Sequence, residues 1–394
     1  MSLARRITAT WRPAGIPLAW RQLMGEKKRF AVAVLGVAFA VVLMLFQVGV
    51  FRAFMVMVVR PIEALRGDLV IISRDMQYLM TTASFPERRL TQTEALPEVR
   101  RVYPVRLAFC MWRNPDCGKQ YELALFGIRR DANPFILPEI ESQLEVLSLP
   151  DGALYDAQSS PEYGDVRAHL KREPALAAEV NRKRLRVLGT FSLGQTLAAY
   201  GTVLVGAETF QRLDGRAANL IELGMIELAP DANPQAVADR LTALLPDDVD
   251  IITRAAFIRR EQAYWQANTP IGFIVIAGLV IALFVGAVIV YQILYTDIND
   301  HLREYATLKA MGMSDGFFTG LLVQEACILP TFGVPPGLLL TYGLFRLAET
   351  VGGLPTRLNL TDTVFVCSLT VIMCIAAGLI ATRRLRAADP SDIF

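Results

Sequence analysis

Residues that could carry chemistry are few in this chain of 394 residues. It holds only two histidines, His169 and His301, with a long apolar run between them, whereas a histidine metal site or a serine–histidine–aspartate triad needs such groups together. No G-x-x-x-x-G-K-[ST] loop, G-x-S-x-G elbow or H-E-x-x-H pair occurs. Paired acids such as Glu139 and Glu141 are typical of a solvated surface. We therefore expect a non-catalytic chain without a cofactor or metal of its own.

Two of the five cysteines, Cys110 and Cys117, flank a strong turn signal, Asn-Pro-Asp at 114–116. A hairpin there would bring their Cα atoms near the 4.4–6.8 Å that a disulfide needs. Two interpretations stay open: a disulfide in an oxidising compartment, or two unpaired thiols on separate faces. The other three cysteines lie in apolar runs, where a thiol is usually a small apolar filler.

The elements around these residues are set by four apolar runs, because about 20 apolar residues suffice for a helix to cross a bilayer. The expected spans are residues 30–58, 270–295, 317–347 and 362–382. Between the first two lies a polar stretch, 59–269, that is long enough for a domain. The expected fold is therefore a four-helix membrane protein, one helix before and three after a large α/β extracytoplasmic domain. Its minor parts are an N-terminus at 1–29, a linker at 296–316, a short outer loop at 348–361 and a tail at 383–394.

Basic residues cluster at both ends of the chain. They are Arg5, Arg6, Arg12, Arg21, Lys27, Lys28 and Arg29 before the first run, and Arg383, Arg384 and Arg386 after the last. By the positive-inside rule both termini belong in the cytoplasm. The protein is then expected in the inner membrane, with its large domain in the periplasm. A helix at 17–30, with Trp20 on its apolar side, is expected to lie in the inner interface.

The outer stretch has the pattern of mixed strands and helices. Apolar, β-branched segments predict strands at 68–72, 101–112, 121–128, 185–188, 225–228 and 248–252. A helix is expected at 234–245, capped by Asn233, and another at 254–268 as a stalk. The polar segment 151–183 is expected to be a mobile or accessory subdomain.

Polar residues inside the apolar runs are rare and open to two readings each. Glu325 either pairs with a basic residue near the cytoplasmic face or stays hydrated near the headgroups. Gln47 either bonds across a dimer or, as we favour, bonds to a neighbouring backbone group. The Gly333–Gly337 segment, with two prolines, predicts a kink or unwound turn.

The linker between the second and third runs predicts a short amphipathic helix. Leu302, Tyr305, Leu308 and Met311 recur every three residues and form one apolar stripe. Other faces carry Arg303, Glu304 and Lys309, and Gly312 is placed to end the helix. The pattern alone allows two interpretations: a helix that presses into a groove of a cytoplasmic partner, or one that lies passively on the membrane.

A family resemblance bears on this choice. The segment from Arg303-Glu304 through Leu308-Lys309-Ala310-Met311-Gly312 to Ser314, followed by Glu325-Ala326, resembles the R-E-x-x-x-L-+-A-[LM]-G-x-[ST] … E-A signature of FtsX/MacB-type ABC permeases. The tail at 390–394 is similar to their P-x-x-[AI]-[LF] ending. The segment 15–23, followed by 39–44, looks like the DevC branch, from DevBCA-type exporters.

The resemblance implies a homodimeric permease that works by mechanotransmission. ATP and Mg would bind a separate, DevA-like ATPase, which docks on the linker. The coupling helix would then comprise Leu302, Arg303, Glu304, Tyr305, Leu308, Lys309, Met311 and Gly312. A DevB-like periplasmic adaptor and a TolC-like outer-membrane protein are the other implied partners, and no nucleic acid is implied.

The expected function is thus the permease of a tripartite ABC exporter for a (glyco)lipid or other amphiphile. Three alternatives remain: an FtsX-like transmitter of signals to a periplasmic hydrolase, a LolC/E-like lipoprotein extractor, and a sensor with no ATPase.

Overall fold

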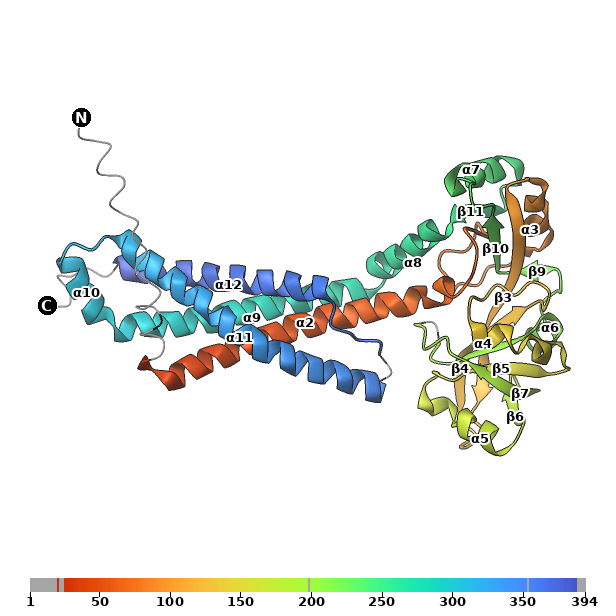
Figure 1. Cartoon of the computed structure of the whole chain (residues 1–394), viewed down its shortest axis with the longest axis horizontal. Helices are drawn as coiled ribbons and strands as arrows, with labels where there is room; N and C mark the ends of the chain where they lie inside the picture. Colours follow the sequence, from red (N-terminus) through yellow and green to blue (C-terminus); the bar gives the residue numbers. More distant parts are fainter. Residues whose placement is uncertain (1–19, 21–24, 198, 353, 388–394) are drawn as a thin grey trace. The chain divides into compact units, whose positions relative to one another are not determined.

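The computed structural model describes residue 20 and residues 25–197, 199–352 and 354–387. Contacts divide the chain into two compact units (Figure 1): a helical unit of Met1–Ala53 and Ile271–Phe394, and a sheet unit of Phe54–Pro270. Half of the expected interfacial helix at 17–30, nearly all of the motif at 15–23 and the whole tail motif at 390–394 fall outside the described residues.

Four helices are long and apolar enough to cross a membrane. They are α2 (Lys27–Glu63), α9 (Pro270–Asp300), α11 (Asp315–Gly352) and α12 (Leu360–Ala387), and the short α10 (Leu302–Ala310) lies between α9 and α11. A helix suits this setting because it satisfies its backbone hydrogen bonds internally. Every apolar run that the sequence singles out is helical, and the chain has the composition and helix lengths of a membrane protein.

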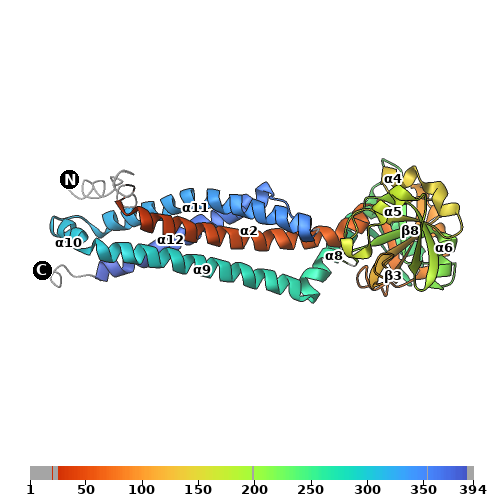
Figure 2. The same ribbon diagram turned by 90° about the horizontal axis from the view of Figure 1, so that it is seen from below.

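Helices α2 and α11 make close contacts at glycines; Figure 2 shows the ribbons of the helical unit. A Cβ at Gly333 of α11 would lie 2.6 Å from the Val37 side chain of α2, and one at Gly337 would lie 2.9 Å from Val41. The two glycines, one turn apart, therefore let the α2 backbone approach α11. Of the two alternatives expected here, the unwound turn is wrong, because α11 is continuous across Pro335 and Pro336; the kink stays a prediction. The freed backbone groups of a proline can be compensated within a packed helix bundle.

A two-bond ion pair joins α2 to α12. The Arg52 guanidinium donates from Nε and Nη2 to the two carboxylate oxygens of Asp362, each at 2.5 Å. Such bidentate pairs fix geometry as well as adding energy.

The sheet unit contains one nine-stranded sheet and a small two-stranded one. The strands of the large sheet are β1 (Leu69–Ser73), β3 (Val99–Arg113), β4 (Gln120–Ile128), β5 (Gly152–Asp156), β6 (Leu176–Val180), β7 (Lys183–Phe191), β8 (Thr202–Gly206), β10 (Leu223–Leu228) and β11 (Val249–Thr253). The small sheet pairs β2 (Phe85–Pro86) with β9 (Leu220–Ile221).

Helices complete this unit. They are α3 (Arg88–Gln92), α4 (Pro138–Glu141), α5 (Val166–Arg172), α6 (Ala207–Asp214), α7 (Pro234–Leu244) and α8 (Arg254–Asn268), with 3-10 turns η1 (Thr93–Ala95), η2 (Leu144–Ser148) and η3 (Pro161–Tyr163).

One half of the large sheet has a ferredoxin-like order. The strands run β11-β1-β10-β3, all antiparallel, and α3 and α7 follow β1 and β10 in the chain. This is the split β-α-β arrangement, used twice. Strand β3 then continues into the other half, where the order β3-β4-β8-β5-β7-β6 closes on itself because β6 also pairs with β3. Closure leaves those strands without a free edge.

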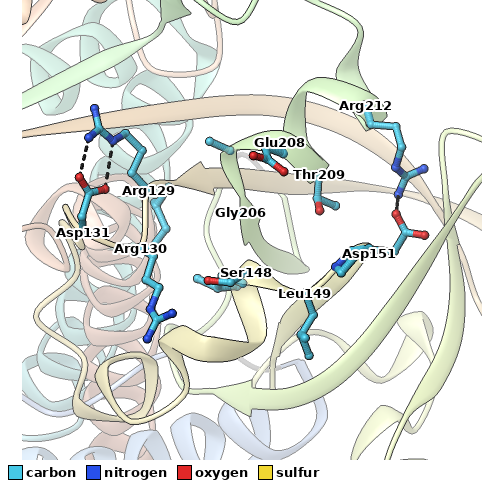
Figure 3. Close-up of a pocket in the computed structure, with 14 residues that line it drawn as sticks. Arg129, Arg130, Asp131, Ser148, Leu149, Asp151, Gly206, Glu208, Thr209 and Arg212 are labelled. Carbon is cyan, nitrogen blue, oxygen red and sulfur yellow. Dashed lines mark hydrogen bonds and ion pairs between the residues drawn. The ribbon is translucent and has the colours of Figure 1, made fainter.

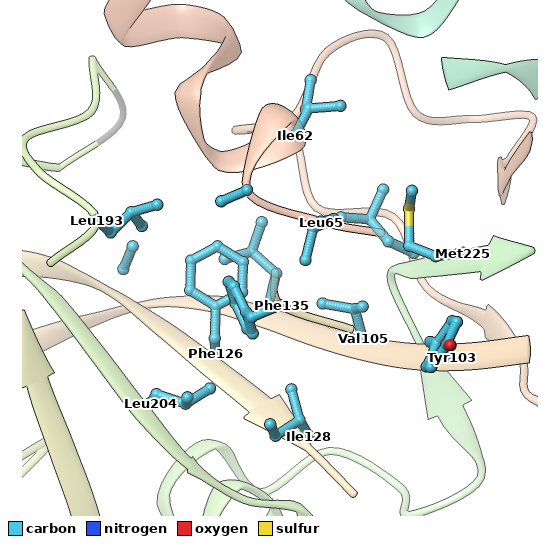
Figure 4. Close-up of a cluster of buried hydrophobic side chains, with 14 of the residues drawn as sticks. Ile62, Leu65, Tyr103, Val105, Phe126, Ile128, Phe135, Leu193, Leu204 and Met225 are labelled. Carbon is cyan, nitrogen blue, oxygen red and sulfur yellow. The ribbon is translucent and has the colours of Figure 1, made fainter. Parts of the chain in front are cut away.

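The sheet is buried on both faces. In β1, Val70 and Ile72 belong to one apolar cluster, whereas Leu69 and Ile71 belong to another under α7. The first cluster is centred on Phe126 and Phe135, whose rings meet edge to face at 5.6 Å (Figure 4). Alternation of side chains along a strand explains why such strands are apolar at nearly every position.

The expected strands at 68–72, 101–112, 121–128, 185–188, 225–228 and 248–252 are confirmed. Asn233 does cap α7, because its side-chain oxygen accepts from the N–H groups of Gln235 and Ala236. The prediction of a mobile subdomain at 151–183 is wrong. Strand β5 lies inside the sheet between β8 and β7, and its buried Asp156 accepts three backbone N–H bonds. Because this one carboxylate satisfies three backbone N–H groups, a segment of polar composition can be part of the core.

The glycine contact yields a stability prediction. Gly333→Ala should lower the free energy of unfolding by about 1–3 kcal/mol through overpacking against Val37, although alanine is the better helix former. Adding Val37→Ala should recover most of the loss. The control, Gly343→Ala on the same helix, faces open space and should not destabilise. Thermal midpoints of the full chain in detergent measure this, and equal midpoints for both single variants would contradict it.

Candidate functional site

The strongest candidate site is α10 and the end of the helix bundle beneath it. The helix ends at Ala310, and Gly312 follows with a positive φ of 94°, a conformation that favours glycine. The N–H of Met313 bonds back to the Leu308 carbonyl at 3.2 Å. The predicted terminator therefore acts as such, and α10 is a compact corner between α9 and α11 (Figure 1).

One face of α10 packs on its own bundle. Tyr305 is 2% exposed, and its ring lies 5.7 Å from that of Phe318 in α11. Leu302 and Leu308 are half-buried against the same apolar cluster. The predicted stripe exists, but three of its four positions face the bundle, so they are not free to enter a partner's groove.

The other face is open. Arg303 and Glu304 are exposed, and Met311 is 69% and Met313 43% exposed. The helical position of Lys309 is described but its side chain is not. The surface available to another molecule therefore combines opposite charges with large apolar side chains of methionine, a residue that adapts well to binding partners.

A charged cluster that the sequence reading missed ties α2 to the start of α10. Arg29 bonds to Asp300 and lies 2.8 Å from Glu26 and 3.8 Å from Asp297. The His301 ring nitrogen is 3.7 Å from an Asp297 oxygen. The signal was present in the sequence, since an aspartate and a histidine four residues apart end an apolar run.

Glu325 lies deeper in the bundle, on α11. It is 0% exposed, and within the described residues neither carboxylate oxygen has a hydrogen-bond partner. No basic group among the described side chains pairs with it, so the expected ion pair stays a prediction for side chains outside that part of the chain. Its burial disagrees with the other expectation, a carboxylate hydrated near the headgroups.

Gln47 joins α2 to α9. Its side-chain Nε2 donates to the Ile274 carbonyl at 3.0 Å, which agrees with the favoured interpretation of a bond to neighbouring backbone. The contact needs a glycine opposite, because a Cβ at Gly278 would lie 2.6 Å from that nitrogen.

The two cysteines of the sheet unit are free thiols. The predicted turn is present, with the Asn114 side chain accepting from the N–H groups of Asp116 and Cys117. However, Cys110 lies opposite Leu123 in the β3–β4 register, and Cys117 is exposed in the loop. A disulfide is therefore not formed: the hairpin register gives the partner position of Cys110 to another residue.

The sheet unit has a polar cavity of about 420 Å³ beside α6 (Figure 3). Its arginines are already engaged: Arg129 pairs with Asp131, and Arg212 pairs with Asp151. His169 lies elsewhere, 2.7 Å from Asp116, and this contact lowers the pKa of the Asp116 carboxyl. Within the described residues, no three His, Cys, Asp or Glu side chains are grouped so that they could hold a metal.

Helix α8 holds the loop at 74–84. Glu261 is 1% exposed and accepts from the Leu79 N–H at 2.7 Å. Tyr264 stacks on Tyr78 with ring centroids 4.1 Å apart. Burial raises the pKa of the Glu261 carboxyl to about 7, against the opposing effect of the Leu79 N–H. The helix that precedes α9 in the chain is thus fixed to the sheet unit by a proton-sensitive contact.

Comparison with known proteins identifies the helical part. Residues 275–390 match the family described as FtsX-like permease C-terminal; the match covers most of α9 and all of α10, α11 and α12. This part of the helical unit is therefore similar to an FtsX-like permease domain. Two relatives, described as uncharacterized ABC transporter permeases of Mycobacterium bovis and Mycobacterium tuberculosis, are each 24% identical over 388 residues, covering 95% of this chain and 98% of theirs. These matches support the FtsX family of ABC transporter permeases.

Two solved structures have a weak likeness to this chain. The periplasmic region of MacB from Actinobacillus actinomycetemcomitans is 14% identical, with a TM-score of 0.34 over 50% of this chain and 94% of that one. The extracellular domain of YknZ from Gram-positive bacteria is 13% identical, with a TM-score of 0.33 over 47% and 98%. The likeness to FtsX-like permeases rests on residues 275–390 and on the two relatives.

The cysteines yield a labelling prediction. A maleimide should modify Cys117 in the folded chain and leave Cys110 unmodified until denaturation. Burial raises the pKa of the Cys110 thiol to about 11, so its thiolate should be about a hundredfold scarcer than that of an ordinary thiol. Peptide mapping by mass spectrometry, with Cys117→Ser as control, measures this. Recovery of the two peptides joined by a disulfide would contradict it.

Glu261 yields a pH prediction. The folded pKa of about 7 exceeds the usual 4.5, so the folded state holds more protons between these values, and the free energy of unfolding should fall as pH rises from 4.5 to 7. The total fall is about 3 kcal/mol. Glu261→Gln keeps the oxygen that accepts from Leu79 and should remove this fall, unlike Glu94→Gln at an exposed position.

Thermal midpoints of the full chain from acidic to mildly alkaline pH test this. If the thermal midpoint of the wild type changed with pH in parallel with that of Glu261→Gln, the prediction would be wrong. Glu261 would then ionise in the folded state as it does in the unfolded state.

Proposed function

We propose that this chain is the non-catalytic permease subunit of an ABC exporter, acting as a homodimer with an ATPase on a separate chain. The observation that carries the proposal is the FtsX-like match at 275–390 together with a short helix, α10, exposed between two membrane-crossing helices. Such a corner offers a partner a rigid surface at the end of the bundle.

The ATPase would dock on the open face of α10. Arg303 and Glu304 supply charges for specificity, and Met311 supplies an apolar anchor that is 69% exposed. Tyr305, Leu308 and Leu302 act differently: they hold α10 to α11 and to the rest of the bundle. A force on the open face would therefore move α9 and α11 together with α10, which is what mechanotransmission requires.

The sheet unit would lie outside the cytoplasm, with both termini inside, following the basic residues at the chain ends. There it would meet a DevB-like adaptor and, through it, a TolC-like duct, and the cargo would be a (glyco)lipid or other amphiphile. The resemblance at 15–23 supports this branch. The clamp of α8 on the loop at 74–84 would pass movement of α9 into the sheet unit.

Co-purification from detergent tests the docking surface. Wild type should bring down an ATPase and an adaptor, whereas Glu304→Lys/Met311→Asp should lose the ATPase about tenfold or more and keep the adaptor, because losing one anchor and one charge costs more than about 1.4 kcal/mol. This pair is preferable to changes at Leu308, which would disturb the packing of α10 itself.

The matched control makes the same kinds of change in the sheet unit. Leu244 is 63% exposed, and the Asp247 side chain is 92% exposed, so Leu244→Asp/Asp247→Lys should retain the ATPase. Retention of the ATPase by the α10 variant would overturn docking on α10. A wild type that brings down no ATPase would overturn the ABC assignment and favour a sensor. A hydrolase in place of the adaptor would indicate a signal transmitter, and bound lipoprotein an extractor.

A further inference from the structure

Glu325 is a buried ionisable group that has no role in the proposed docking of an ATPase on α10. It is 0% exposed, both oxygens lack a hydrogen-bond partner, and its neighbours along α11 include the fully buried Leu322, Ala326 and Leu329. An ionised carboxylate without a partner in such surroundings costs several kcal/mol, so it takes up a proton instead.

The charges around Glu325 add to this preference. Asp297 of α9 is the described residue whose charge acts on it, and it lies in the same end of the bundle, between the buried Leu294 and Ile298. A second negative charge close to a carboxyl opposes its ionisation.

The described basic side chains of α2 and of the α9–α10 junction lie beside Asp297. From α2, Arg29 lies 3.8 Å from Asp297, with Glu26 beside it, and His301 lies 3.7 Å away. From α10, the Tyr305 side chain belongs to the same apolar cluster. Helix α12 approaches through Gly378, which faces Ala326, and its described side chains from 366 to 382 carry no charge.

We propose that Glu325 is a proton-binding site in the bundle, kept occupied because the buried carboxyl has no partner among the described residues. A proton from water adds to one carboxylate oxygen of Glu325 and gives a neutral acid.

The site lies where proton loss would change the structure. Asp297 lies in the last turn of α9, Glu325 lies in the first third of α11, and α10 connects the two helices. An ionised Glu325 would be an unpaired charge in an apolar interior, and the helices packed around it would separate. Because Tyr305 holds α10 to this interior, α10 would loosen as well. The proposal does not depend on an ATPase, so it can fail or hold apart from the proposed function.

Infrared spectroscopy of the full chain in lipid bilayers tests the site. The wild type should show the C=O stretch of a protonated carboxyl at neutral pH, and Glu325→Gln should lose it, whereas Glu349→Gln, an exposed acid on the same helix that pairs with Arg346, should keep it.

Amide exchange of residues 302–310 tests the link to α10. At a pH above the titration midpoint of the band, these amides should exchange faster in wild type than in Glu325→Gln, and at lower pH the two should agree. Comparison at one pH cancels the intrinsic dependence of exchange on pH. A wild type labelled with ¹³C-glutamate reports the band even where the glutamine variant fails to fold. Absence of the band at neutral pH, or its persistence in a folded Glu325→Gln, would overturn the proposal.

Discussion

An apolar bundle tolerates charge only where each charge has a partner or is neutralised, and this constraint decides the layout of the helical unit. Its charged side chains gather where a partner is available. Arg52 and Asp362 join α2 to α12 by two hydrogen bonds, and Arg29 meets two aspartates at the α10 end. Between these points the helices approach through glycines such as Gly333 and Gly337, because only dispersion and close packing hold apolar helices together in lipid. Glu325 is the exception, and it is the reason for regarding that turn of α11 as functional.

The sheet unit solves a different problem, that of burying a sheet on both faces. Strand β3 is the shared element: its first half pairs with β10 in the ferredoxin-like order, and its second half pairs with β4 and with β6 in the closed half. Two apolar layers then lie on opposite sides of the same strands. The cavity by α6 borders the first layer through Ile128 and Leu147, and its three arginines are paired with acids.

Much of this could be predicted from the sequence. Apolar run length gave the four long helices, because helices in lipid must satisfy their own backbone, and β-branched segments gave six strands. The errors have physical causes. The segment 151–183 has polar composition, but its strand β5 is held by Asp156, a role that composition does not reveal. At Pro335 and Pro336 the sequence allowed an unwound turn that is not there, because a helix inside a bundle can accommodate proline without unwinding. For α10, periodicity predicted the apolar stripe but not the surface that the stripe contacts. A helix between two membrane spans can pack on its own helix bundle or on a partner protein, and both surfaces are apolar.

That last point changes how α10 would couple on the proposed function. A helix that pressed its whole apolar stripe into a partner would be held by the partner and only loosely by its own chain. Here Tyr305 and its neighbours fix α10 to α11, and Asp297 and Arg29 join the last turn of α9 to α2. A partner that moves Met311 and Glu304 would therefore move the ends of α9 and α11 with them. On the proposal for Glu325, the energy needed to separate α9 from α11 would also depend on whether that carboxyl is neutral.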